Sequence, residues 1–85
     1  MTTTNLPTFN EYKQTVDDMV ASKKLSIEEA IILLSVFHNH LNGNQTHTNY
    51  LLAATNLRWK ELNWTLNGLV QKGGIRKIDK YWYTL

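Results

Sequence analysis

The side chains best suited to chemistry recur every three or four positions in the second half of the chain. At about 100° per residue, a helix over residues 58–72 would place Lys60, Asn67 and Gln71 on one face, with Asn63 on its flank. Lysine can donate to guanine acceptors, and asparagine or glutamine can pair with the edge of adenine. Arg58, at the start of this stretch, would contact a phosphate beside the bases. The pattern predicts a surface that reads base edges, although an ordinary solvated face would have the same composition.

Trp64 lies on the same face and fits base reading less well. An exposed tryptophan could pack on a sugar or on a thymine methyl group. Tryptophan is also a preferred anchor in protein interfaces. A third alternative is that a neighbouring element covers Trp64 and makes it part of the core. The sequence leaves all three alternatives open.

Basic residues concentrate in the same half of the chain. Residues 1–42 contain three lysines against five acidic residues, a net charge of −2, whereas residues 43–85 contain six basic residues against two acidic ones, a net charge of +4. A phosphate backbone would favour this concentration, and so would a merely solvated surface. Arg76, Lys77 and Lys80 make the hairpin basic and suit it to phosphate or minor-groove contact. Trp82 or Tyr81, depending on the hairpin register, would be exposed nearby, and aromatics beside basic residues also suit stacking on single-stranded nucleic acid. The commoner reason for such aromatics is that they cover the core.

Residue types that support catalysis or metal binding are present but badly spaced. His38 and His40 would diverge by about 200° on a helix, and neither cysteine nor a carboxylate lies close to them in sequence. The adjacent acidic pairs point apart, as residues on solvated faces do; they are Asp17-Asp18 and Glu28-Glu29. No glycine-rich phosphate loop occurs. We therefore expect neither an enzyme nor a metal site nor a cofactor.

The length and composition indicate one small domain. Eighty-five residues are near the lower limit for folding without disulfides or metals, and the chain has no cysteine. The first residues lack the basic and apolar regions of a secretory signal, and the longest apolar run, residues 30–34, is too short to span a bilayer. We expect a cytoplasmic protein without a membrane segment. Residues 1–7 are expected to be a disordered tail, and residues 8–85 a single domain.

Two helices should precede the polar face and support it. Thr8 and Glu11 have the spacing of a capping box, and an apolar stripe follows from Phe9 to Val20. Ser26 and Glu29 repeat the capping box, and the second helix should continue to about Leu41 and end at Asn42-Gly43. It is apolar on more than one face, so it should be buried on two sides. Surplus apolar surface on this helix, residues 26–41, or on the first one could form a homodimer seam.

Residues 46–72 should form two further helices with a tight turn between them. Thr46 or Thr48 would cap the first, and Asn56 would adopt the left-handed conformation at the turn before Leu57 returns to the core. The second should run from about Arg58 to Gly73-Gly74. Its buried side should have Trp59 at the edge and the following residues at the centre: Leu62, Leu66, Leu69 and Val70.

The last residues, about 75–85, are rich in β-favouring side chains and predict a two-stranded hairpin. A two-residue turn at Asp79-Lys80 would place Ile75, Lys77, Trp82 and Thr84 on one face. A three-residue loop over residues 79–81 would instead align Ile75 with Tyr83 and Leu85. We favour the second register, because Asp-Lys lacks the glycine of a primed turn and because three apolar residues then face the core.

This second half resembles the winged helix-turn-helix domains of MarR-type and ArsR-type bacterial repressors. The resemblance covers roughly residues 25–85 and lies in the spacing of Leu51-Leu52, Asn56-Leu57, Leu62, Leu66, Leu69 and Lys72-Gly73-Gly74-Ile75. Gly74 replaces the apolar residue usual in the last string. The resemblance implies an α+β, mostly helical fold with an extra N-terminal helix and a C-terminal two-stranded β-wing. It also implies a recognition helix that enters the major groove of DNA.

These observations converge on double-stranded DNA as the partner and on a small transcriptional regulator, acting as a dimer, as the protein. The expected DNA-binding residues are Arg58, Lys60, Asn63, Trp64, Asn67, Gln71, Arg76, Lys77 and Lys80. The alternative is a protein-binding winged helix, such as an inhibitor or adaptor from a phage or another mobile element, that uses the Trp64 face.

Overall fold

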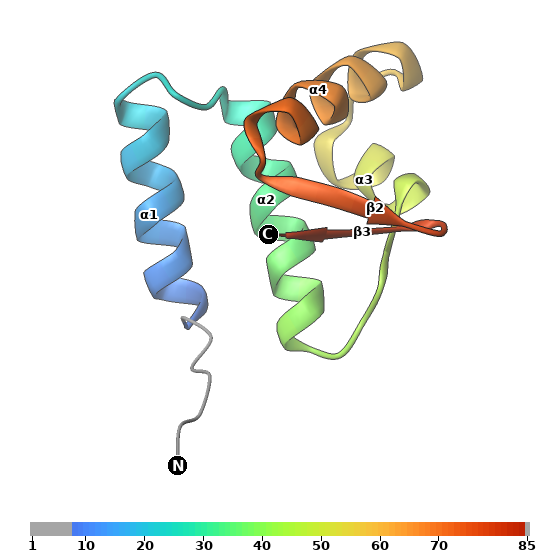
Figure 1. Cartoon of the computed structure of the whole chain (residues 1–85), viewed down its shortest axis with the longest axis horizontal. Coiled ribbons are helices and arrows are strands. Elements are labelled where there is room, and N and C mark those ends of the chain that lie inside the picture. The colour runs from blue at the N-terminus through green and yellow to red at the C-terminus, as the bar shows by residue number, and fades with distance from the viewer. Residues whose placement is uncertain (1–7, 85) are drawn as a thin grey trace.

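The computed structural model describes residues 8–84 and has an α+β architecture (Figure 1). Its elements are, in order, α1 (Phe9–Ala21), α2 (Ile27–Leu41), β1 (Thr46–His47), α3 (Thr48–Thr55), α4 (Trp59–Lys72), β2 (Ile75–Ile78) and β3 (Tyr81–Thr84). The α+β, mostly helical class expected from the sequence is therefore confirmed. The tail expected over residues 1–7, and the place of Leu85 in the hairpin, lie outside the described residues.

Both capping boxes form as predicted. Thr8 Oγ1 accepts from the backbone N–H of Glu11 at 3.2 Å, and Glu11 Oε1 accepts from the backbone N–H of Thr8 at 2.8 Å. Ser26 and Glu29 make the equivalent pair at 3.1 and 2.8 Å. These bonds satisfy backbone donors that the first turn of each helix would leave unpaired. Helix α2 ends at Leu41, and Gly43 follows with a φ of 74°, as expected.

Helix α2 is the central element of the core. One side faces α1, where the Tyr12 ring stacks on Phe37 with the ring centroids 4.1 Å apart. Its other side meets α3, α4 and the sheet. The prediction that α2 is buried on two sides is confirmed. The helical spacing in the sequence also placed Ile27, Ile31 and Leu41 on an apolar face of α2, but all three are exposed.

The turn between α3 and α4 has the expected conformation, with Asn56 left-handed at a φ of 56°. The cap of α3 differs from the prediction: its N-cap is His47, whose Nδ1 accepts from the backbone N–H of Asn49 at 3.2 Å. The two candidate threonines are buried instead. Asn39 Nδ2 donates to Thr46 Oγ1 at 3.0 Å, and Trp82 Nε1 donates to Thr48 Oγ1 at 2.9 Å. Each hydroxyl thus satisfies a buried donor rather than a helix end.

The three strands form an antiparallel sheet in the order β1-β3-β2. Ile75 pairs with Thr84 and Lys77 with Trp82, so Asp79-Lys80 is a two-residue turn. The three-residue loop that we favoured from the sequence is wrong. The observed register buries Trp82, the largest apolar side chain of the hairpin, and brings its indole N–H to an acceptor. The sheet also has a third strand beyond the expected two, since Thr46 pairs with Trp82 and His47 with Tyr81.

No helix within residues 8–84 is both long enough and apolar enough to cross a lipid bilayer.

The turn conformation predicts a stabilising substitution. Asp79 has a φ of 57°, a region that costs an L-residue conformational energy and costs glycine none. We expect Asp79→Gly to raise the free energy of unfolding by about 0.5 kcal/mol, measured by urea denaturation. Lys80→Gly is the matched control, and it should lower that free energy because it only adds flexibility to the unfolded chain. Equal effects of the two substitutions would contradict the turn geometry.

Candidate nucleic-acid interface

Helix α4 has one buried face and one exposed face. Leu62, Leu66 and Leu69 are buried at its inner face, as predicted. Two residues assigned to that side are in fact exposed: Val70 at 45% and Trp59 at 54%. The buried face of α4 therefore includes fewer residues than the sequence pattern indicated. The elements that pack against this helix are α2, α3 and β2, and they leave Val70 and Trp59 open to solvent. Exposed apolar surface therefore borders the polar face of α4.

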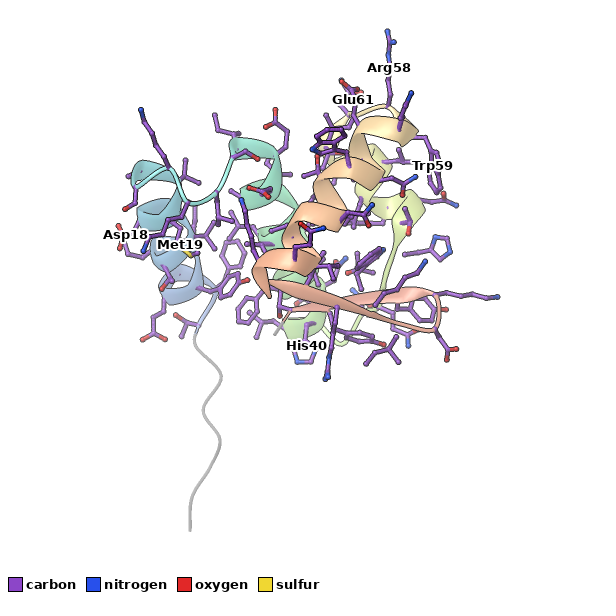
Figure 2. The ribbon with its side chains drawn as sticks, turned by 45° about the horizontal axis from the view of Figure 1, so that its top comes forward. Asp18, Met19, His40, Arg58, Trp59 and Glu61 are labelled. Atoms are coloured by element: carbon purple, nitrogen blue, oxygen red, sulfur yellow. The ribbon has the colours of Figure 1, made fainter. Side chains whose placement is uncertain are left out.

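The outer face of α4 collects the polar side chains that the sequence placed there. Lys60, Asn67 and Gln71 are exposed, and Asn63 is half-buried on the flank. Arg58 is the N-cap residue, and its backbone N–H donates to Glu61 Oε1 at 3.1 Å. Its side chain points away from the rest of the molecule (Figure 2). The helix therefore presents one cation at its end and a row of hydrogen-bonding groups along its length.

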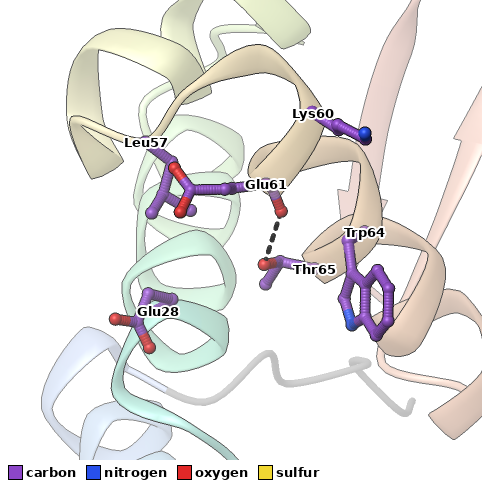
Figure 3. Close-up of a pocket in the computed structure, with 6 residues that line it drawn as sticks. All are labelled: Glu28, Leu57, Lys60, Glu61, Trp64 and Thr65. Atoms are coloured by element: carbon purple, nitrogen blue, oxygen red, sulfur yellow. Dashed lines mark hydrogen bonds between the residues drawn. The ribbon is translucent and has the colours of Figure 1, made fainter.

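Trp64 lies in the middle of this face with 82% of its surface exposed. The alternative that a neighbouring element covers it is therefore wrong. Three shallow hollows, of about 380, 270 and 260 Å³, border its side chain. The largest lies between α4 and the start of α2 (Figure 3), and the residues that line it with Trp64 are Glu28, Leu57, Lys60, Glu61 and Thr65. A large apolar ring thus stands between hollows that a partner could fill.

The C-terminal end of α4 is fixed to α2 by an ion pair. Lys72 Nζ lies 2.7 Å from Glu29 Oε1 and 3.0 Å from Glu29 Oε2, and it also donates to the backbone oxygen of Lys24 at 3.0 Å. Glu29 is buried, so the expectation that Glu28 and Glu29 both lie on a solvated face is wrong for Glu29. Glu29 lies in the first turn of α2, beside the C-terminal end of α4. Lys72 is therefore already paired with Glu29 inside the domain.

The surroundings of Glu29 act on its pKa in opposite directions. Burial alone would raise the pKa of the carboxyl group. The hydrogen bonds from Lys72 and Ser26, together with the charge of Lys72, outweigh the burial and lower the pKa below its ordinary value. Gly68 lies beside this group, and a Cβ atom at that position would lie 3.4 Å from Glu29 Oε2.

The three basic residues of the hairpin are all exposed, but they do not share a face. Residues directly paired across an antiparallel sheet point to the same side. Lys77 pairs with Trp82 and its Nζ lies 5.5 Å from the centroid of that ring, whereas Arg76 pairs with Tyr83 on the opposite side. Lys80 is in the turn. The hairpin therefore presents positive charge on both faces and at its tip.

The histidines have separate places. His47 caps α3, the His38 ring lies 5.5 Å from the Phe9 ring, and His40 is exposed near the end of α2 (Figure 2). Over residues 8–84, no cluster of three His, Cys, Asp or Glu side chains could hold a metal ion.

Of the two aromatics that the sequence offered for exposure beside the basic residues of the hairpin, Trp82 is buried and Tyr81 is on the outer face of the sheet. The sequence interpretation did not single out His47 and Tyr83, which share this face with Tyr81. The signal was available in the string Tyr81-Trp82-Tyr83, because alternate residues of a strand point to opposite faces in any register.

The lowered pKa of Glu29 predicts how stability depends on pH. A carboxyl group with a lowered pKa stabilises the fold above its ordinary value, here 4.5, and loses this contribution as the pH falls. We expect Glu29→Gln to destabilise the protein at pH 7 by about 1 to 2 kcal/mol, a modest figure because Lys72 is partly exposed. The difference from the unsubstituted protein should shrink at pH 3, as measured by urea denaturation at both values. Glu28→Gln, at the exposed neighbour, should change little, and an equal loss there would refute the assignment.

Comparison with protein-family models, with curated proteins and with solved structures gave no match to the chain.

Proposed function

We propose that α3, α4 and the β2–β3 hairpin act as a winged helix-turn-helix that binds double-stranded DNA, in a small, non-enzymatic transcriptional regulator of the cytoplasm. The observation that carries the proposal is the two-sided character of α4. Its inner face is buried in the core, and its outer face presents Lys60, Asn67 and Gln71 to solvent beside a basic hairpin. This is the arrangement by which a recognition helix offers side chains to base edges.

The dimensions and the turn support this proposal. A helix of 14 residues is about 21 Å long, and the major groove admits a helix. Asn56 allows the sharp change of direction between α3 and α4. In this arrangement the N-terminal half of α4, with Lys60 and Asn63, lies closest to the bases, and Asn67 follows one turn after Asn63. Arg58 contacts a phosphate beside them.

The charges available for phosphate contact also fit. With Lys72 engaged by Glu29, five exposed basic side chains remain in the second half of the described chain: Arg58, Lys60, Arg76, Lys77 and Lys80. Three of them are in the hairpin, where a wing would contact the flanking backbone. The exposed Ile27 and Ile31 of α2 would supply apolar surface for a homodimer that reads two half-sites.

DNA binding should depend strongly on salt. We expect the logarithm of the association constant for mixed-sequence duplex DNA to fall with the logarithm of the salt concentration with a slope of about −4. Each phosphate contact contributes about −0.9, and the proposal assigns such contacts to Arg58, Arg76, Lys77 and Lys80. Lys80→Glu should weaken all sequences alike, whereas Asn67→Ala should weaken a selected target and spare the others. Fluorescence anisotropy at several salt concentrations measures both effects. Lys13→Glu on α1 is the charge-matched control, and binding that it weakens as much as Lys80→Glu, or no binding at low salt, would sink the proposal.

A second candidate function rests on Trp64. A tryptophan that is 82% exposed and bordered by hollows is the kind of residue that anchors a protein interface. The apolar side chain of Leu57 and the carboxylates of Glu28 and Glu61 also line the largest of these hollows. On this hypothesis the outer face of α4 binds a protein, and the domain is an inhibitor or adaptor.

The two candidates predict different behaviour of Trp64→Ala. If Trp64 anchors a protein, the immobilised Trp64→Ala domain should no longer capture a partner that the unsubstituted domain captures. The fold of this variant and its affinity for duplex DNA should stay unchanged. As part of a DNA-reading face, its loss should lower DNA affinity. Trp59→Ala, which removes another exposed tryptophan of α4, is the matched control. A partner retained by Trp64→Ala and lost by Trp59→Ala would reject the Trp64 anchor.

A further inference from the structure

The pairing of the three strands defines an outer sheet face, and the winged-helix proposal uses only one residue of it, Arg76. Residues paired directly across an antiparallel sheet share a side. Thr46, Trp82 and Ile75 are buried on the inner side. The outer side therefore consists of His47, Ile78, Tyr81, Arg76 and Tyr83. We call this set the outer sheet face.

The aromatic rings of this face are partly open to solvent. Tyr81 and Tyr83 are half-buried, and neither belongs to the apolar core cluster, whereas Trp82 between them does. They are two residues apart on β3, so their side chains leave the same face about 6.8 Å apart along the strand. The His47 ring meets Tyr81 edge-on, with the centroids 6.2 Å apart. Two tyrosine rings therefore follow each other along the central strand β3, with the His47 ring beside them on β1.

Positive charge accompanies these rings. Arg76 lies directly across from Tyr83, and Lys80 is in the turn next to Tyr81. Asp79 is the one acidic residue of residues 75–84. Ile78, 48% exposed, is the one large aliphatic residue on this face. Tyrosine rings flanked by cations suit bases and phosphates better than an apolar partner.

We propose that the outer sheet face binds single-stranded nucleic acid, with unpaired bases stacked on Tyr81 and Tyr83. Arg76 contacts the phosphate backbone or extends the stack with its guanidinium group, and Lys80 contacts the backbone beyond the turn. Stacking requires only the face of a base, so binding is tolerant of sequence. In a duplex the base faces are covered by their neighbours, so this face selects melted or single-stranded segments. The proposal does not depend on duplex binding by α4.

The test is the affinity for labelled oligo(dT) and oligo(U), measured by fluorescence anisotropy at low salt. Loss of a stacked base should weaken binding about 5- to 150-fold, so we expect Tyr81→Ala and Tyr83→Ala each to fall in that range. Tyr83→Phe keeps the ring and should bind like the unsubstituted protein. Tyr50→Ala, which removes a tyrosine 47% exposed on α3, is the matched control and should change little. A preference between the two oligonucleotides distinguishes DNA from RNA as the source of the strand.

Several results would overturn the proposal. The first is that neither oligonucleotide binds at low salt. The second is that Tyr81→Ala and Tyr83→Ala bind as tightly as the unsubstituted protein while circular dichroism shows that both variants are folded. The third is that Tyr50→Ala loses as much affinity as the two substitutions on the sheet. Asn67→Ala separates the two nucleic-acid proposals. It should leave oligonucleotide binding intact, whereas the two tyrosine substitutions should leave binding of fully paired duplex DNA intact.

Discussion

Trp82 connects three neighbouring elements of the fold, β1, β2 and α3. It is buried against the core, its indole N–H donates to Thr48 at the start of α3, and its backbone pairs with both Thr46 and Lys77. The hydrogen bond satisfies a buried donor that would otherwise cost about 1 to 3 kcal/mol. By joining β1, β3 and α3, this residue sets the register of the sheet. The register in turn decides which hairpin residues face outward.

The features that follow from local chemistry could be predicted from the sequence. The capping boxes of Thr8 and Ser26, the left-handed Asn56 and the glycine after α4 depend only on residues within a few positions. The exposed face of α4 was predicted for the same reason, because helical periodicity alone separates Lys60, Asn67 and Gln71 from Leu62, Leu66 and Leu69.

The features that depend on distant partners could not be predicted in the same way. Glu29 is buried because Lys72, 43 positions away, faces it. The hairpin register depends on the fit of Trp82 against Thr48, which competes with the turn preference of Asp79-Lys80. The exposure of Val70 and Trp59 reflects which elements happen to lie beside α4. In each case the outcome depends on a contact between residues far apart in the sequence, and local patterns do not indicate which residues the fold brings together.

Gly68 shows how two positions of this chain constrain each other during sequence change. Glycine within a helix costs about 1 kcal/mol relative to alanine, so alanine would ordinarily be favoured there. A methyl group at position 68 would lie 3.4 Å from a carboxylate oxygen of Glu29, which is already buried and paired with Lys72. Alanine at position 68 would therefore contact the ion pair that fixes α4 to α2. Residues in contact do not contribute independently to stability, so the effect of a substitution at position 68 depends on whether Glu29 and Lys72 are still present.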